Sequence, residues 1–172
     1  MLEITGDDIA LLAEADLRTL LGRLCEEELR RRQLSTAAVT YGGDQKASDG
    51  GLDVRVSLPQ VPPSEFISRA STGFQVKRAD LPAAKIRNEM RPKKALRKVI
   101  RDLAQQSGAY IIVSSKGSTS DSVLNARRAA MRRSAGRAAA GLLVDFYGRQ
   151  RMPGFALIPG SSRGCENALK RP

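Results

Sequence analysis

Histidine and tryptophan are absent from this chain of 172 residues, and cysteine occurs only twice. Without imidazole the chain cannot carry out Ser-His-Asp or Cys-His hydrolysis, and it cannot form a histidine-metal nuclease centre or an HExxH zinc site. Two cysteines cannot complete a four-ligand zinc site within one chain. Because Cys25 and Cys165 lie far apart and outline no disulfide framework, we expect a reducing, cytoplasmic location.

Aromatic residues and long apolar runs are also scarce. Aromatic side chains make up 4% of the chain, which argues against a surface that binds nucleic acid mainly by base stacking. No stretch approaches the roughly 18 apolar residues of a membrane span. The first 17 residues are acidic and interrupted by charge, unlike a secretory signal. We therefore expect no membrane partner.

Positive charge is abundant and unevenly distributed. The 29 Lys and Arg residues exceed the 18 Asp and Glu residues and give a net charge of +11. Residues 78–151 hold seventeen basic and five acidic side chains, whereas residues 1–77 hold nine and twelve. A basic surface of this strength favours a polyanionic partner such as DNA.

Apolar periodicity predicts an α/β domain with a mixed sheet packed between helices. Helices are expected over residues 6–15, 16–33, 93–107 and 119–134. Strands are expected over residues 37–41, 52–58, 73–79 and 109–114, and residues 137–146 read as helix turning into strand. The basic stretch between Pro82 and Pro92 is expected to be irregular. Composition assigns residues 1–150 to the domain and residues 151–172, rich in Gly, Pro and Ser, to a flexible tail or linker.

One group of polar residues suggests chemistry. Asp53 follows two glycines at the start of a predicted strand, and Gln75 and Lys77 share one face of the next strand. A carboxylate and an amide oxygen suit Mg²⁺ or Mn²⁺, and a lysine can hold the attacking water in phosphodiester hydrolysis. Taken alone, Asp53 could simply cap a turn, and the other two could form the solvated face of an edge strand.

The strings SDGGLDVRV and GFQVKRAD resemble the PD-(D/E)xK nuclease superfamily, in particular its Mrr-like branch with a QxK element. The resemblance implies a restriction-endonuclease-like three-layer sandwich in which Asp53 and Gln75 bind the metal and Lys77 is catalytic. It also implies a glutamate from the first core helix, for which Glu27 is the best match, followed by Glu26 and Glu28. A plain acidic helix face is the alternative for these three glutamates.

With an N-terminal helix of the form LRTLLGRLCEEELRRR, the domain also resembles nuclease modules at the front of bacterial anti-phage STAND NTPases. This resemblance implies defence against phage or foreign DNA, with a separate NTPase or sensor domain or a homo-oligomer as partner. Basic side chains on the predicted helices and loops are expected to contact DNA phosphates, with a mere solubility surface as the alternative. They are Lys93, Lys94, Arg97, Lys116, Arg127, Arg128, Arg132 and Arg133.

The sequence thus predicts a metal-dependent DNA endonuclease. A non-catalytic nucleic-acid-binding module of the same fold and an oligomerising or regulatory domain remain the alternatives.

Overall fold

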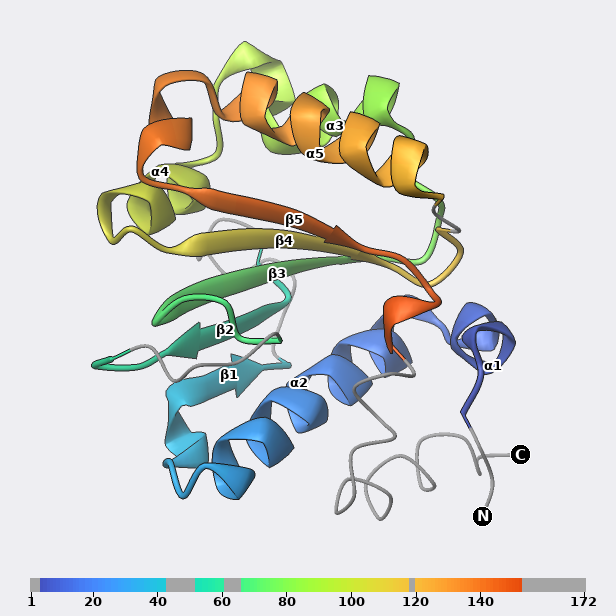
Figure 1. Cartoon of the computed structure of the whole chain (residues 1–172), viewed down its shortest axis with the longest axis vertical. Coiled ribbons are helices and arrows are strands. Elements are labelled where there is room, and N and C mark those ends of the chain that lie inside the picture. The colour runs from blue at the N-terminus through green and yellow to red at the C-terminus, as the bar shows by residue number, and fades with distance from the viewer. Residues whose placement is uncertain (1–3, 43–51, 61–65, 118–119, 153–172) are drawn as a thin grey trace.

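The computed structural model describes residues 4–42, 52–60, 66–117 and 120–152, and these form an α/β fold (Figure 1). A five-stranded mixed sheet has its strands in chain order, β1-β2-β3-β4-β5. The strands are β1 (Val39–Tyr41), β2 (Val54–Ser57), β3 (Ser71–Lys77), β4 (Ala109–Ser114) and β5 (Leu143–Tyr147). The first three pair antiparallel, whereas β3, β4 and β5 pair parallel. The mixed sheet expected from the sequence is therefore confirmed.

Helices flank the sheet in two groups (Figure 1). They are α1 (Gly6–Leu11), α2 (Glu14–Arg31), α3 (Ala83–Met90), α4 (Lys98–Gln105) and α5 (Asp121–Ala135). Strand β4 is buried along its whole length, and successive side chains enter opposite cores. Ile111 and Val113 join the core that α2 covers, whereas Tyr110 and Ile112 join the core under α3, α4 and α5. This alternation is what a strand covered on both faces requires.

Helix α2 follows the predicted apolar spacing, and its leucine stripe packs against the sheet. Leu17, Leu21 and Leu29 are fully buried in the first core. Gly22 lies on the same side and lets the ring of Tyr41 from β1 approach the helix. The helix begins at Glu14, two residues earlier than predicted, so Glu14 belongs to α2 and not to the short α1.

Gly22→Ala is expected to lower the free energy of unfolding by about 1–3 kcal/mol, because the new methyl group would overlap the Tyr41 ring. Urea denaturation followed by circular dichroism measures the change. Gly6→Ala is the matched control, since its methyl group would lie at an ordinary 3.5 Å from the Arg149 carbonyl oxygen. Equal stability of the two variants would contradict this packing.

The basic region after β3 differs most from the prediction. Residues 83–90, expected to be irregular, form α3, which buries Ile86 and Met90. The helix predicted over 93–107 begins only at Lys98, because a 3-10 turn at Pro92–Lys94 has two residues with left-handed backbone angles. The start of 137–146 is a 3-10 helix (Gly136–Ala140), and β5 follows it.

Two expectations concern the ends and the environment of the chain. Residues 153–172 of the predicted tail lie outside the described residues. No helix within the described ranges combines the length and the apolar character that a membrane crossing needs.

Candidate functional site

Asp53 lies directly before β2, and its side chain reaches across to β3. The pairing of Val54 with Phe74 places it opposite Gln75, and its own N–H donates to the Phe74 carbonyl oxygen at 2.9 Å. Its Oδ2 accepts two hydrogen bonds of 2.8 Å, one from Gln75 Nε2 and one from the Val76 main-chain N–H. The sequence-predicted partners Asp53 and Gln75 are therefore in direct contact.

The second carboxylate oxygen of Asp53 accepts a hydrogen bond from a different partner. Arg18 Nε on α2 donates to Oδ1 at 3.0 Å, and both side chains are about nine-tenths buried. Burial raises the pKa of Asp53 above its ordinary value, although the Val76 hydrogen bond and the charges of Arg18 and Lys77 act against the shift. The carboxylate is therefore largely shielded from solvent, and the cationic side chains of Arg18 and Lys77 lie close to it.

The raised pKa of Asp53 predicts a specific pH dependence of stability. An acid whose pKa is higher in the folded state stabilises the fold at pH values below its unfolded pKa of 3.8, and this contribution is lost as the pH rises through the raised value. Asp53→Asn should remove that component from the pH profile of thermal unfolding. Asp102→Asn, in an exposed pair with Lys98, should retain it. Identical profiles for the wild type and Asp53→Asn would contradict the burial effect.

Glu14 is a second acid near Asp53 that sequence reasoning missed. It is the first residue of α2, and its Oε2 accepts from the Arg78 main-chain N–H, just beyond β3, at 3.3 Å. Its charge also raises the pKa of Asp53. The expected helix boundary after residue 15 concealed this position; a helix start at residue 14 would have pointed to it.

Glu27, predicted as the second carboxylate, does not reach the site. It pairs with Arg30 at 3.2 Å on an exposed part of α2. It lies nine residues beyond Arg18, which is about 13 Å along a helix axis. Glu26 also pairs with Arg30, and Glu28 pairs with two arginines that follow it on the helix. The assignment of Glu27 is thus corrected: all three glutamates form ion pairs with arginines near the end of α2, and Glu28 is itself buried.

Lys77 ends β3 and lies on the same face as Gln75. Its Nζ contacts Glu89 Oε1 of α3 at 3.2 Å, and its side chain is 28% exposed. The same glutamate oxygen accepts from Arg97 Nη2 at 3.1 Å. Lys77 is therefore near Asp53, and its positive charge acts to lower the pKa of Asp53. The direct ion-pair partner of Lys77 is Glu89.

Three buried polar atoms around Asp53 lack a hydrogen-bond partner: Gln75 Oε1, Arg18 Nη2 and Tyr110 Oη. Tyr110 is fully buried on β4, where its pKa is raised by burial and by the charges of Glu89 and Asp53. Unpaired buried polar atoms are uncommon in proteins and require a partner such as water or an ion. An acceptor and a cationic donor are thus available beside Asp53 for further ligands.

The residues predicted to contact nucleic acid divide into two groups. The exposed ones are Lys93, Lys94, Lys116, Arg132 and Arg133. The others pair with acidic side chains of the protein itself, and only Arg127 is buried deeply enough to correct its assignment as a phosphate contact. Arg127 is 2% exposed, pairs with Asp80 and stacks on Phe146. Arg128 is half-buried against Asp145, and Arg97 is held by Glu89.

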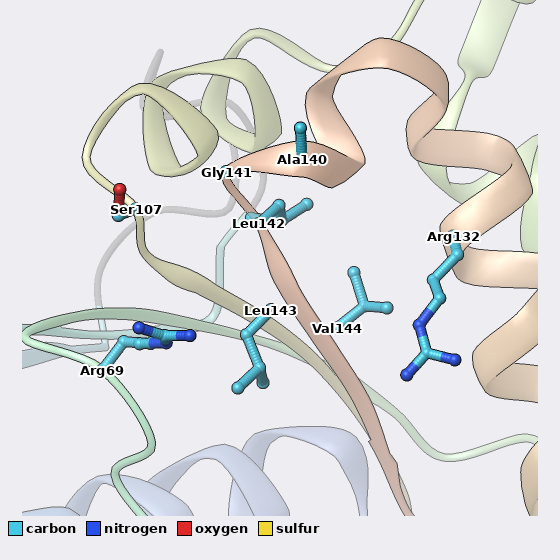
Figure 2. A pocket seen from close by; sticks show the side chains of 8 residues that line it. All are labelled: Arg69, Ser107, Arg132, Ala140, Gly141, Leu142, Leu143 and Val144. Carbon is cyan, nitrogen blue, oxygen red and sulfur yellow. The ribbon is translucent and has the colours of Figure 1, made fainter.

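A hollow of about 360 Å³ lies at the end of the parallel strands that is opposite to the end with Lys77. Figure 2 shows Arg69 and Arg132 on either side of Leu143 and Val144, where β5 begins. Lys77, by contrast, ends β3, which runs parallel to β4 and β5. Apart from Arg132, no sequence-predicted site residue lines this hollow.

Two neighbouring strands thus bring a buried carboxylate, an amide oxygen without a partner and an ammonium group to one part of the sheet. These groups suit a hard cation and a phosphate. The part of the chain that the structure describes holds no cluster of three or more His, Cys, Asp or Glu side chains suited to a metal ion. Comparison of the chain with protein-family models, curated proteins and solved structures found no match.

Proposed function

We propose that this chain is a metal-dependent DNA endonuclease of the restriction-endonuclease-like fold, which cuts phosphodiester bonds in defence against phage or foreign DNA. One observation carries the proposal: Asp53 and Gln75 share a 2.8 Å hydrogen bond while Gln75 Oε1 stays buried without a partner. A carboxylate oxygen and an amide oxygen are both ligands that Mg²⁺ or Mn²⁺ prefers.

The residues present fit a divalent cation. Asp53 would hold it through a carboxylate oxygen, Gln75 through Oε1, and Glu14 would add negative charge from the start of α2. Arg18 now neutralises Asp53 and would have to release Oδ1 if the cation took that oxygen. When bound, Mg²⁺ would supply charge neutralisation for the phosphate and a more acidic water.

Two cationic side chains of the protein, Lys77 and Arg18, would interact with the phosphate. Lys77 lies near Asp53, and its ammonium group would hold an attacking water and offset developing negative charge. Arg18 Nη2 is buried and has no partner, so a phosphate oxygen entering the site would satisfy it. To accelerate the reaction, both groups would have to stabilise the charge of the transition state more than that of the ground state.

An exposed pair of lysines supports binding to the DNA backbone. Lys93 and Lys94 are exposed and have φ angles of 56° and 67°, a conformation that costs a non-glycine residue about 1–2 kcal/mol. Arg91 fastens this turn, because it donates to the Lys94 carbonyl oxygen at 3.4 Å and to the carbonyl oxygen of Ser134 on α5. Strain of this kind concentrates at functional sites.

Replacing both lysines by glycine is expected to raise stability while weakening DNA binding. Glycine relieves the left-handed strain, so the unfolding free energy should rise by about 1–2 kcal/mol for the double variant. Affinity for a DNA duplex, measured by fluorescence anisotropy at low salt, should fall. The Lys93→Ala/Lys94→Ala variant is the control: it should bind DNA as weakly but gain no comparable stability. Unchanged binding by both variants would exclude this turn from the DNA surface.

Plasmid nicking tests the proposed function. Purified protein is incubated with supercoiled plasmid and Mg²⁺ or Mn²⁺, and the Asp53→Asn and Lys77→Ala variants are run beside the wild type. Nicking that both substitutions remove supports the nuclease. An engineered dimer of the chain should be assayed in parallel, because an isolated nuclease domain can stay inactive until a partner brings two copies together.

A non-catalytic DNA-binding module is the second candidate. It is favoured by one observation, which is that both oxygens of Asp53 already accept hydrogen bonds from the protein. Tight, salt-sensitive DNA binding without nicking by monomer or dimer would support this candidate. A chain that binds no DNA at low salt would instead have a regulatory or oligomerising role.

A further inference from the structure

We propose that Glu89 is a positioning residue that fixes the ammonium group of Lys77 for the chemical step. The inference rests on the proposed function, and it adds a residue from α3 that the QxK pattern does not contain. Glu89 Oε1 lies 3.2 Å from Lys77 Nζ, and its side chain is only 16% exposed. A partly buried carboxylate restrains a lysine more than a surface carboxylate does, because solvent screens the pair less.

Glu89 is itself held from the other side. Arg97 Nη2 donates to the same oxygen at 3.1 Å, and Arg97 Nε donates to the Glu89 main-chain oxygen at 2.8 Å. The Arg97 N–H also donates to the Met90 carbonyl oxygen at 3.0 Å, which ties the start of α4 to the end of α3. Glu89 therefore has little freedom to move, and Lys77 is tied to a fixed point.

The charge pattern of the sequence supports a specific role for this acid. Glu89 is the only acidic residue between Asp80 and Asp102, a stretch that contains eight Lys and Arg residues. An uncompensated carboxylate in this basic stretch would repel DNA phosphates, so a role in contacting DNA does not explain why Glu89 is present. Lys77 and Arg97, which both contact Glu89 Oε1, offset the charge of the carboxylate, and the carboxylate in turn orients Lys77.

The test compares Glu89→Gln with Glu27→Gln, which makes the same chemical change in an exposed pair with Arg30. Single-turnover nicking by Glu89→Gln should be about 10- to 100-fold slower than by the wild type, with unchanged DNA affinity and with Glu27→Gln at the wild-type rate. Adding Lys77→Ala to Glu89→Gln should give no loss beyond Lys77→Ala alone, because the two residues act as a unit. A Glu89→Gln rate equal to or above the wild-type rate would overturn the proposal.

A second measurement does not depend on nicking. With ¹⁵N-labelled lysine, an ammonium held in an ion pair exchanges its protons slowly enough to give an NMR signal, which Lys77→Ala identifies by its loss. The signal should be present in the wild type and Glu27→Gln and absent from Glu89→Gln; its survival in Glu89→Gln would overturn the proposal. If Glu89→Gln does not fold, Arg97→Lys, which retains both charges but loses the two-point hold, should weaken the signal. A wild-type chain that nicks DNA neither as the monomer nor as the engineered dimer overturns the proposed function alone, and the NMR result then decides whether Glu89 fixes Lys77.

Discussion

Asp53→Asn should remove magnesium-dependent nicking, with a rate at least about 10³-fold below that of the wild type. The carboxylate is the acid in contact with both Gln75 and the Val76 amide, and Asn would carry no charge for the cation. Isothermal titration with Mn²⁺ should show loss of binding in the same variant. A circular dichroism spectrum and an unfolding midpoint like those of the wild type would separate loss of the metal from loss of the fold.

Asp102→Asn is the matched control for this experiment. Asp102 pairs with Lys98 at 2.7 Å on α4, and its side chain is 35% exposed. Its loss should leave both nicking and Mn²⁺ binding at wild-type values. Nicking by Asp53→Asn at a rate close to that of the wild type would contradict the metal role of Asp53.

Lys77→Ala should slow nicking by about 10²- to 10⁴-fold while Mn²⁺ binding stays near the wild-type value. The ammonium group lies near Asp53 but pairs with Glu89, so its removal takes a positive charge from the site without removing a proposed metal ligand. Single-turnover rates at saturating DNA measure the effect, because they separate the chemical step from binding.

Lys85→Ala serves as the control, since Lys85 is an exposed lysine on α3. It should nick at the wild-type rate or lose a small amount of DNA affinity. If Lys77→Ala lost Mn²⁺ binding as completely as Asp53→Asn, Lys77 would act through the structure of the site and not on the reaction.

The contact between Asp53 and Gln75 could be predicted from the sequence, because strand alternation and chain order are local properties. Glu14 and Glu89 could not. Glu14 depends on where one helix ends and the next begins, and boundaries are weakly encoded. Glu89 lies on a helix that buries only Ile86 and Met90, which is too short an apolar pattern to reveal the helix.

The basic residues of α5 show a different limit of sequence reasoning. Arg127 and Arg128 follow one another in a polar run, and both were expected at the surface. Arg127 is buried on Phe146, whereas Arg128 lies half-buried against Asp145. Which face of a helix is buried depends on the elements that the helix packs against, and these lie far away in the sequence. A long arginine side chain can also bury its aliphatic part as an apolar residue does.

Paramagnetic broadening by Mn²⁺ tests most directly whether Asp53 and Gln75 share a cation. In NMR spectra of the whole chain, Mn²⁺ below stoichiometry should broaden the Gln75 side-chain amide and the Val76 main-chain amide in the wild type, and neither in Asp53→Asn. Broadening confined to Glu26 and Glu27 on α2, or equal broadening of the Gln75 and Val76 signals in Asp53→Asn, would contradict a metal site at this end of β3.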